Sequence, residues 1–419
     1  MGILQTVFEL TNVEGVKVLT ILGMKFKLKK KNKDDKKYIL EPIYCNFVNR
    51  FCKVKKNKIV FINFMNWQFA DNPKYLAEEF LIRDIKNLDL VWFTNKNTDL
   101  SLIPQNLRTV KYTSFKALYE FMTAKVWVIN ANPFLMLKKG AKKAKETLCM
   151  QTWHGTMGIK QESAAAQKAY EELGWTKWQK LSASMYDYIF TDSEFEKEKY
   201  KTAFWGNGEI LKYGVPRDKY FFTNHSDFAQ KIKEYYNIPQ ENKILLYAPT
   251  WRVDKRCNVY NIDIKLLKRS LNKRFGGNWS ILIRSHVQMK KNIFNALYDK
   301  DEIVNVATYP DMQELMLAAD ALITDYSSCL SEYVILKKPS FIYASDIKDF
   351  EQGFAYPITD LPSPVATDNG ELSEAVLNFN QENYNKKTDK FLSQMGFCDD
   401  ENSCKRIVDF ILNKMEQTK

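Results

Sequence analysis

The hydrophobic positions of this chain gather in short apolar runs, and segments whose apolar residues recur every three or four positions separate many of them. Short, uniformly apolar runs predict strands of a parallel sheet covered on both faces, whereas the longer periodicity predicts the covering helices. We therefore predict an α/β fold. In the first half of the chain the predicted strands are 59–64, 88–94, 109–112, 126–130, 147–153, 188–191 and 210–213, with a helix at 73–85.

The same alternation starts again after a segment punctuated by Gly214 and Pro216. We place the junction between two α/β domains at 223–226, and we expect a ligand cleft where the carboxyl ends of the two sheets meet. A helical pattern near the C-terminus, which includes Cys404, Ile407 and Ile411, predicts a helix that packs on one of the domains. The predicted strands of the second half are 244–248, 280–283, 303–306, 321–324 and 340–344.

Residues 1–50 form a leader that differs from both domains. An apolar run at 16–22 predicts a strand, and eight lysines follow between Lys25 and Lys37. This run is either a solvated charged segment or a contact with anionic lipid, where each lysine adds about 1 kcal/mol, although Asp34 and Asp35 weaken the second interpretation. The predicted division is a leader at 1–50, an N-terminal domain at 51–223 and a C-terminal domain at 224–419.

A polar turn interrupts the apolar stretch at 321–346. A strand ends at the cluster Thr324-Asp325-Tyr326-Ser327-Ser328, a helical segment continues to Leu336, and a strand follows Pro339. The start of a helix presents unpaired backbone N–H groups, and here two serine hydroxyls accompany them just beyond a strand. This order predicts a site for an anionic group such as a phosphate.

Histidine and arginine residues follow other predicted strands. His154 lies in a glycine-flanked turn after 147–153, and a pKa near 6.5 would let it accept a proton from a hydroxyl at neutral pH. The alternative is a core histidine hydrogen-bonded at a strand end. Arg284 and His286 follow the strand at 280–283 and could bind a diphosphate, and Arg252 follows Pro249 at the end of another strand, where an ordinary surface arginine is the alternative.

Composition narrows the function classes. The chain has 419 residues, with 62 Lys and Arg against 50 Asp and Glu, so its net charge of +12 favours an anionic partner. Seven cysteines without a C-x-x-C pair argue against a disulfide framework and a zinc site. No apolar run approaches the roughly 18 residues of a membrane span, and Glu9 and Glu14 argue against a signal peptide.

The spacing of Asp299 and Asp301 resembles a metal-binding pair, but it falls in a charged turn, and we predict no metal site.

Five ordered motifs resemble those of the CDP-glycerol:poly(glycerophosphate) glycerophosphotransferase family of teichoic-acid and capsule synthesis. The resemblance runs from Ile59 to Leu372. It implies a GT-B fold, in which two Rossmann-like domains face each other across a cleft, here preceded by the basic leader. The motifs are Trp153-His154-Gly155-Thr156 with Lys160, Gly214-Val215-Pro216-Arg217, Tyr247 to Arg252, Arg284-Ser285-His286, and Ile323 to Ser328 with Lys338-Pro339.

The resemblance also implies roles for individual residues. His154 matches the histidine proposed as the base for the acceptor hydroxyl, and His286 and Arg284 match positions near the donor diphosphate. The residues implied in donor binding are Arg252, Arg284, Thr324, Asp325, Ser327, Ser328 and Glu332, and the supporting residues are Gly155, Thr156, Lys160 and Arg217. The implied reaction is attack of an acceptor hydroxyl on the β-phosphorus of a CDP-alditol, which transfers alditol phosphate and releases CMP. No cofactor and no structural metal are implied.

The implied partners are a CDP-glycerol or CDP-ribitol donor, a lipid-linked acceptor of the undecaprenyl type or a polymer acceptor, and an anionic membrane surface. The implied location is the cytoplasmic face of a bacterial cell membrane. The N-terminal lysines and a basic helix at 138–145, with Lys139, Lys142 and Lys143 on one face, are the two candidate membrane contacts.

Two positions depart from the family pattern. Many members read Phe-Asp where this chain has Ser331-Glu332, and Arg-Gly-Phe where it has Gln352-Gly353-Phe354. These departures leave the choice of donor open. A GT-B nucleotide-sugar glycosyltransferase or epimerase is the alternative function. A nucleic-acid-binding protein is a remote one, because the basic residues do not interleave with aromatic residues and no nucleic-acid module is present.

Overall fold

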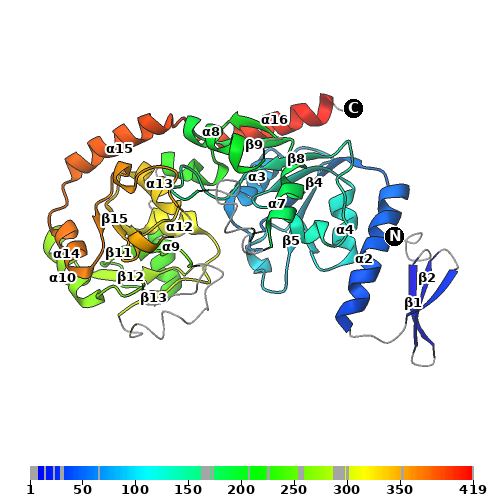
Figure 1. Ribbon diagram of the computed structural model, residues 1–419, viewed down its shortest axis with the longest axis horizontal. Helices are drawn as coiled ribbons and strands as arrows, with labels where there is room; N and C mark the ends of the chain where they lie inside the picture. The colour runs from blue at the N-terminus through cyan, green and yellow to red at the C-terminus, as the bar shows by residue number, and fades with distance from the viewer. Residues whose placement is uncertain are drawn as a thin grey trace.

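A computed structural model describes most of the chain, and it describes side chains from residue 40 onward. Two α/β units lie side by side, and the N-terminal strands stand beside the first unit (Figure 1). None of the described helices is both long enough and apolar enough to cross a membrane. The described residues are 8–13, 16–21, 24–28, 33–64, 67–161, 171, 174–205, 208–223, 227–252, 259–285, 298, 302–350 and 353–417.

The first unit is built on a seven-stranded parallel sheet with strand order β10-β9-β8-β7-β4-β5-β6. Its central strands are buried, which explains why their sequences are uniformly apolar. Helices α2, α4, α5, α7 and α8 contribute to the hydrophobic core on one face. The strands are β4 (Lys55–Ile62), β5 (Asp89–Thr94), β6 (Arg108–Lys111), β7 (Ala124–Ile129), β8 (Leu148–Gln151), β9 (Tyr188–Thr191) and β10 (Glu209–Lys212). The helices are α2 (Lys33–Phe51), α3 (Asp71–Ile82), η1 (Leu100–Leu102), α4 (Phe115–Met122), α5 (Phe134–Leu137), α7 (Thr176–Ala183) and α8 (Glu194–Ala203).

The second unit has a six-stranded parallel sheet with strand order β13-β12-β11-β14-β15-β16. The sheet and the helices that cover it share one hydrophobic core. The strands are β11 (Lys243–Tyr247), β12 (Trp279–Ile283), β13 (Val304–Asn305), β14 (Ala321–Thr324), β15 (Ser340–Tyr343) and β16 (Val365–Ala366). The helices are η2 (Pro216–Phe222), which enters this unit, α9 (Asp227–Tyr236), α10 (Ile264–Phe275), α12 (Met312–Ala318), α13 (Cys329–Tyr333), η3 (Val334–Leu336), η4 (Ile347–Asp349), η5 (Ile358–Asp360), α14 (Asn369–Leu377) and α15 (Gln381–Met395).

Each strand predicted at 59–213 and 244–344 is present: β9 and β14 have the predicted bounds, and the ends of the other strands differ by a few residues. Strand β16 was not predicted, because two residues are too few to show a hydrophobic pattern. In the leader, β1 (Phe8–Val13), β2 (Val16–Ile21) and β3 (Met24–Leu28) form an antiparallel sheet. The lysine side chains of 25–37 lie outside the described side chains, so a membrane contact there stays a prediction.

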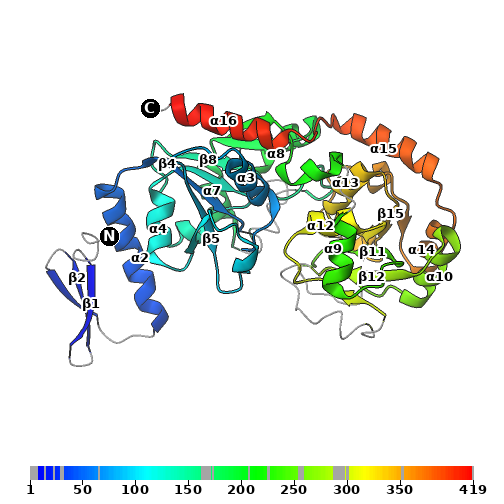
Figure 2. The same ribbon diagram turned by 180° about the vertical axis from the view of Figure 1, so that it is seen from behind.

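The last helix, α16 (Ser403–Gln417), returns to the first unit. Figures 1 and 2 show α15 along the second unit and α16 along the first. Cys404, Ile407 and Ile411 enter the core that α3 forms on the second face of the first sheet, and Arg83 of α3 pairs with Asp409. The chain therefore crosses between the units twice, at η2 and before α16, so α16 packs on the first unit although it belongs to the range 224–419. The division into 1–50, 51–223 and 224–419 stays a prediction.

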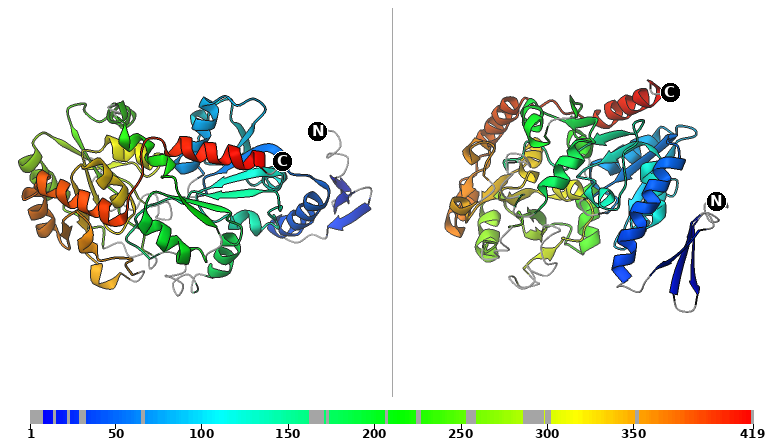
Figure 3. Two further views of the ribbon diagram at one scale, coloured as in Figure 1. Left: turned by 90° about the horizontal axis from the view of Figure 1, so that it is seen from above. Right: turned by 45° about the vertical axis from the view of Figure 1, so that its right-hand side comes forward.

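Figure 3 shows the two units side by side in two further views. A buried group of charged side chains joins these units where α3 meets the start of α12. Lys74 Nζ lies 2.7 Å from Asp311 Oδ2 and 3.0 Å from Glu314 Oε1, and the Tyr75 hydroxyl donates to Asp311 Oδ2 at 2.9 Å. Although burial disfavours the ammonium, Asp311 and Glu314 raise the pKa of Lys74. We call Lys74, Asp311 and Glu314 the Lys74 cluster.

Candidate functional site

A cleft of about 590 Å³ lies between the two units. Its walls come from loops after β7, β8, β11, β12 and β14, which is the edge predicted for a ligand site. Of the residues predicted for the site, the cleft is lined by His154, Gly155, Lys160, Arg217, Arg284, Ser327, Ser328 and Glu332.

His154 is held by the end of the neighbouring strand. Its Nδ1 lies 2.7 Å from the carbonyl oxygen of Asn130, which follows β7, and its ring lies 4.2 Å from that of Trp153. The Asn130 side chain is itself fixed, because its amide donates to Asn63 Oδ1 at 2.9 Å. A carbonyl oxygen only accepts hydrogen bonds, so in the neutral imidazole Nδ1 carries the proton and Nε2 carries the lone pair. This tautomer suits a general base that acts through Nε2.

Asn72 fixes the turn that carries His154. Its side-chain amide donates to the carbonyl oxygens of Thr152 and Trp153 at 3.1 and 3.0 Å, and its Oδ1 accepts from the backbone N–H of Arg217 at 3.0 Å. Trp153 has a φ of 52°, a conformation that costs a non-glycine residue free energy and needs such support. Asn72 was not among the predicted site residues, because a single asparagine in the first turn of a helix carries no distinctive signal.

Gly155 and Gly158 let the His154 turn approach the second unit closely. A Cβ atom at Gly155 would lie 2.5 Å from Ser328 Oγ, and one at Gly158 would lie 3.3 Å from Ser328 Cβ. Ser331 Oγ also donates to the carbonyl oxygen of Thr156 at 2.8 Å, across the same contact. The glycine spacing that drew attention to His154 thus has a steric cause: it brings the turn against the polar turn after β14.

Arg217 connects the two units beneath the cleft. Its guanidinium pairs with Asp71 at 3.2 Å and with Glu332 of α13. The other carboxylate oxygen of Glu332 accepts from Gln313 Nε2 at 2.9 Å. Burial disfavours the charged guanidinium, but Glu332 and Asp71 raise the pKa of Arg217. Both oxygens of Glu332 therefore have protein partners, although its side chain lines the cleft.

Arg284 and the serines form the polar wall on the second unit. Arg284 Nη1 donates to the carbonyl oxygen of Tyr309 at 2.6 Å, and burial lowers its pKa from the ordinary value for arginine. Ser285, Ser327 and Ser328 line the cleft beside it. One cation and several hydroxyls at a strand edge can hold a phosphate group.

Three predicted donor-binding residues are engaged inside the second unit. Arg252 pairs with Asp346 at 2.6 Å and with Asp325 at 2.8 Å, and its guanidinium lies over the ring of Tyr326. Thr324 Oγ1 donates to the carbonyl oxygen of Ala248 at 2.7 Å. Arg252, Thr324 and Asp325 are not among the described residues that line the cleft, and their contacts tie the loops after β11, β14 and β15 together.

Other predicted residues are placed as follows. Lys160 lines the cleft and pairs with Phe354 in an antiparallel bridge between the units. Thr156 is buried, and its hydroxyl donates to Asp192. His286 and Gln352 lie outside the described residues, as do Asp299 and Asp301, so the predictions for them stay predictions.

The predicted basic helix at 138–145 is wrong. Helix α5 ends at Leu137, and Gly140, with a φ of 89°, packs against Pro42 of α2, where a Cβ atom would lie 2.9 Å from the proline Cα. Lys139 lies 3.6 Å from Glu41, and Lys143 lies 2.9 Å from Asp187. These lysines therefore do not share one helical face.

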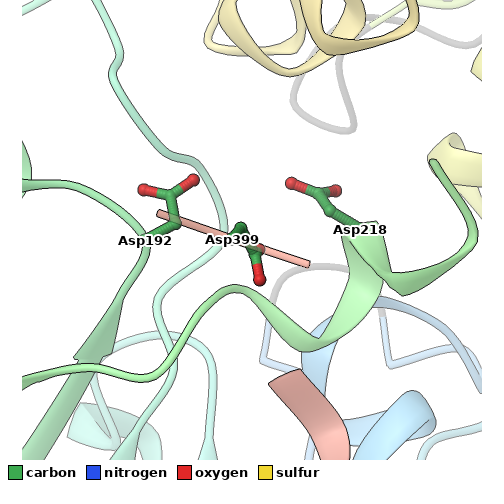
Figure 4. Close-up of side chains that lie close together, drawn as sticks. All are labelled: Asp192, Asp218 and Asp399. Atoms are coloured by element: carbon green, nitrogen blue, oxygen red, sulfur yellow. The ribbon is translucent and has the colours of Figure 1, made fainter. Parts of the chain in front are cut away.

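Three carboxylates, shown in Figure 4, lie close together where the chain crosses between the units. Asp192 follows β9, Asp218 lies in η2, and Asp399 precedes α16; their ligand atoms lie within 4.8 Å of one another. Among the described residues they form the group that could hold a metal ion. Burial raises the pKa of Asp192 to about 7, and it raises those of Asp218 and Asp399 well above the ordinary value. We call these residues the carboxylate cluster; with such pKa values it retains protons near neutral pH.

Comparison with known proteins identifies the family. The CDP-Glycerol:Poly(glycerophosphate) glycerophosphotransferase family matches residues 44–413. A teichoic acid poly(glycerol phosphate) polymerase of Staphylococcus epidermidis is 31% identical over 391 residues, which are 90% of this chain and 52% of that protein. A teichoic acid glycerol-phosphate transferase of Staphylococcus aureus is 29% identical over 354 residues, 81% of this chain and 88% of that protein.

A solved structure supports the same family and the same fold. A variant of the wall teichoic acid polymerase TagF, soaked with CDPG, superposes with a TM-score of 0.77 at 27% identity and covers 91% of this chain and 94% of that chain. This likeness confirms the predicted GT-B fold. The chain spans about half the length of two of the curated polymerases that it matches, 52% of one and 45% of the other. With the family matched along most of its length, the chain belongs to the CDP-glycerol:poly(glycerophosphate) glycerophosphotransferase family.

Proposed function

We propose that this protein transfers glycerol phosphate from CDP-glycerol to an acceptor hydroxyl in teichoic acid synthesis and releases CMP. The observation that carries the proposal is the position of His154, which lines the same cleft as Arg284, Ser327 and Ser328 with its Nδ1 proton directed to Asn130. The curated glycerol-phosphate relatives named above are 29–31% identical to this chain, whereas two ribitol-phosphate relatives are 25% identical. This difference favours glycerol over ribitol as the transferred alditol.

The proposed reaction uses the two walls of the cleft differently. Arg284, Ser327 and Ser328 hold the diphosphate of the donor, and Nε2 of His154 takes the proton of the acceptor hydroxyl. The acceptor oxygen forms a bond to the β-phosphorus, the bond from that phosphorus to the bridging oxygen breaks, and CMP leaves with the bridging oxygen. His286 remains a proposed second catalytic histidine on the basis of its motif.

The other predicted residues receive supporting roles. Arg252, Thr324 and Asp325 hold the donor-side loops in place through the contacts they make with one another and with the β11 loop. Glu332 orients Arg217, and Gly155 and Thr156 bring the His154 turn to the second unit. In this proposal residues 51–223 form the acceptor domain and residues 224–419 form the donor domain.

We also propose a lipid-linked or polymeric acceptor and a place at the cytoplasmic face of the membrane, where the leader contacts anionic lipid. The support is the family membership and the lysine-rich composition of residues 25–37.

A donor panel tests the proposal. The full chain is incubated with an acceptor and with CDP-glycerol, CDP-ribitol or a UDP-sugar, and the released nucleotide is measured. We expect CMP from CDP-glycerol, and turnover of the UDP-sugar alone would support the glycosyltransferase or epimerase instead.

Replacement of the proposed base sharpens this test. His154→Ala should lower the CMP release rate by about 10²- to 10⁴-fold, the usual contribution of a positioned general base. His225→Ala is the matched control, because the sequence places His225 in a polar linker, and it should keep the wild-type rate. A wild-type rate in His154→Ala would contradict the assignment.

A further inference from the structure

The side chain of Asn72 joins three segments that are far apart in the sequence. It lies in the first turn of α3, is fully buried, and contacts the β8 loop at Thr152 and Trp153 and the start of η2 at Arg217. An asparagine amide offers two N–H donors and a carbonyl oxygen that accepts. Here both donors bind the loop of the proposed base, and the oxygen binds the segment by which the chain enters the second unit.

The two carbonyl groups that Asn72 binds belong to successive residues, and this restricts the backbone between them. In an extended strand, successive carbonyl groups point to opposite sides, so one amide cannot reach both. Trp153 has a φ of 52°, in the left-handed region, and the carbonyl oxygens of Thr152 and Trp153 lie 3.1 and 3.0 Å from the amide nitrogen. Asn72 therefore favours a backbone conformation that a tryptophan would otherwise avoid.

The left-handed turn at Trp153 determines where His154 lies. It ends the direction of β8, and Nδ1 of His154 then lies 2.7 Å from the carbonyl oxygen of Asn130. Gln151 Oε1 accepts from the backbone N–H of Trp153 at 2.9 Å, and the indole packs against Phe204 with the ring centroids 4.7 Å apart. An extended residue at this position would continue β8 and carry the imidazole away from the carbonyl oxygen that fixes its tautomer.

The third hydrogen bond of Asn72 connects this turn to the donor side of the cleft. The backbone N–H of Arg217 donates to Oδ1 at 3.0 Å, and the guanidinium of Arg217 pairs with Glu332, which lines the cleft. Two residues further along α3, Lys74 pairs with Asp311 at 2.7 Å. The first turns of α3 are thus fixed to the second unit at two points, and the base is fixed to the same turns.

We propose that Asn72 is a positioning residue of the transfer reaction, which holds His154 where Nε2 can take the proton of the acceptor hydroxyl. Asn72 is not among the described residues that line the cleft, so it acts through the turn and through η2. The proposal rests on the glycerophosphotransferase function above and adds a residue to it. Loss of Asn72 misplaces the base but leaves Arg284, Ser327 and Ser328 in place, so kcat falls while the KM for CDP-glycerol stays unchanged.

Two substitutions in the full chain separate the contacts of Asn72. Asn72→Ala removes all three hydrogen bonds, whereas Asn72→Asp keeps the shape and the acceptor for Arg217 but presents an oxygen to the two carbonyl groups. With CDP-glycerol and a saturating acceptor, kcat should fall about 10²-fold in both variants, the usual result of a misplaced reacting group. Asn369→Ala is the matched control and should keep the wild-type kcat. Asn369 begins α14 outside the cleft lining, donates to the Asn261 carbonyl oxygen at 2.9 Å and accepts from the Asp263 N–H at 2.8 Å.

Nitrogen NMR of the histidine rings distinguishes a misplaced base from a general loss of folding. The chain has three histidines, so enzyme labelled at histidine gives few signals, and the spectrum of His154→Ala assigns those of His154. At about pH 8.5, where an ordinary imidazole is neutral, we expect a protonated Nδ1 and a bare Nε2 in the wild type. In Asn72→Ala the ring should exchange between its two tautomers, while the signals of His225 stay unchanged. Asn369→Ala should leave all the signals unchanged.

A wild-type kcat in Asn72→Asp would overturn the proposal, because the bonds to the two carbonyl groups would then be dispensable. A lower kcat with unchanged His154 signals would overturn it as well, since Asn72 would then serve folding alone. If Asn72→Ala does not fold, Asn72→Asp decides by the same two measurements. The NMR signals do not depend on turnover. A tautomer change in Asn72→Ala, in an enzyme that releases no CMP from CDP-glycerol, would keep the control of His154 by Asn72 and refute the proposed reaction; CMP release with an unchanged His154 spectrum in the variants would do the reverse.

Discussion

Two groups of buried acidic side chains lie where the two halves of the protein meet. One group shares a buried lysine, and the other consists of three aspartates without a cation in their midst among the described residues. In the Lys74 cluster, Asp311 and Glu314 share a lysine at 2.7 and 3.0 Å. In the carboxylate cluster, the three aspartates lie within reach of one another, and the side chain of Arg406 approaches Asp399 at 3.8 Å. Aspartate therefore occurs in two different electrostatic environments at this interface: beside a lysine in one cluster and beside other carboxylates in the other.

The pKa shifts show the consequence. Burial alone would raise the pKa of Asp311, but Lys74 outweighs it, and the pKa of Asp311 is lowered. Burial raises the pKa of Asp192 to about 7, and nearby Glu196 adds to the rise against the hydrogen bond from Thr156. Asp311 and Lys74 are thus both ionised at neutral pH and hold α3 against α12, whereas the buried aspartates of the carboxylate cluster are stabilised by retaining protons. Geometry alone would have described both as interface carboxylates.

Removal of the lysine should have the largest effect. Lys74→Ala leaves Asp311 and Glu314 buried without their shared cation, and breaking a buried pair in this way costs about 3–5 kcal/mol. We expect a large fall in the thermal unfolding temperature at pH 7. Lys265→Ala is the control, because Lys265 forms an exposed pair with Glu302 at 3.3 Å, and such pairs contribute about 0–1 kcal/mol. Equal effects of the two substitutions would show that the Lys74 cluster does not hold the halves together.

The sequence predicts the elements of this interface better than it predicts their contacts. Strands such as β9 and β14 were predicted at their observed bounds, because a buried parallel strand must be apolar along its whole length. The His154 turn and the serine turn were likewise predicted to face each other, since both follow strands and polar residues collect at that edge. The contact between Gly155 and Ser328 is the physical result of that placement.

The rest of the site could not be predicted, because it depends on contacts between residues far apart in the chain. Asn72 is a single amide in a helix, and its role arises only from the carbonyl oxygens of Thr152 and Trp153 beside it. The family resemblance implied that Arg252 binds the donor, and in the structure its guanidinium pairs with Asp325 and Asp346.

A substitution that removes the charge of Asp311 but keeps the shape of its side chain sharpens the comparison. Asp311→Asn keeps the shape of the side chain, and asparagine also caps a helix well, so the bond from Gln313 N–H to residue 311 is retained. With an amide NH₂ group in place of Oδ2, the attraction to Lys74 and the acceptor for the Tyr75 hydroxyl are lost, and we expect destabilisation of about 2–3 kcal/mol at pH 7.

The pH dependence of this loss follows from the lowered pKa. The contribution of the Asp311 carboxylate is present above its unfolded pKa of 3.8 and disappears as the pH falls through its folded pKa, so wild type and variant should converge in acid. Thermal unfolding measured from pH 3 to pH 8 checks this, with Asp389→Asn, in an exposed pair with Lys337, as the control. A constant difference over the whole range would contradict an ionised Asp311.

The same change in the carboxylate cluster should have the opposite sign. Asp192→Asn cannot ionise, and its Oδ1 can still accept the hydrogen bond from Thr156. Because the folded pKa of Asp192 is raised from 3.8 to about 7, its contribution to stability is complete below pH 3.8 and is lost as the pH rises to about 7. At pH 8 the variant should therefore be more stable than the wild type, and at pH 4 the two should be about equal. Asp311→Asn, measured in the same titration, supplies the contrast: if Asp192→Asn destabilised the protein at pH 8 as Asp311→Asn does, Asp192 would have to be ionised and paired with a cation, and the two clusters would be alike.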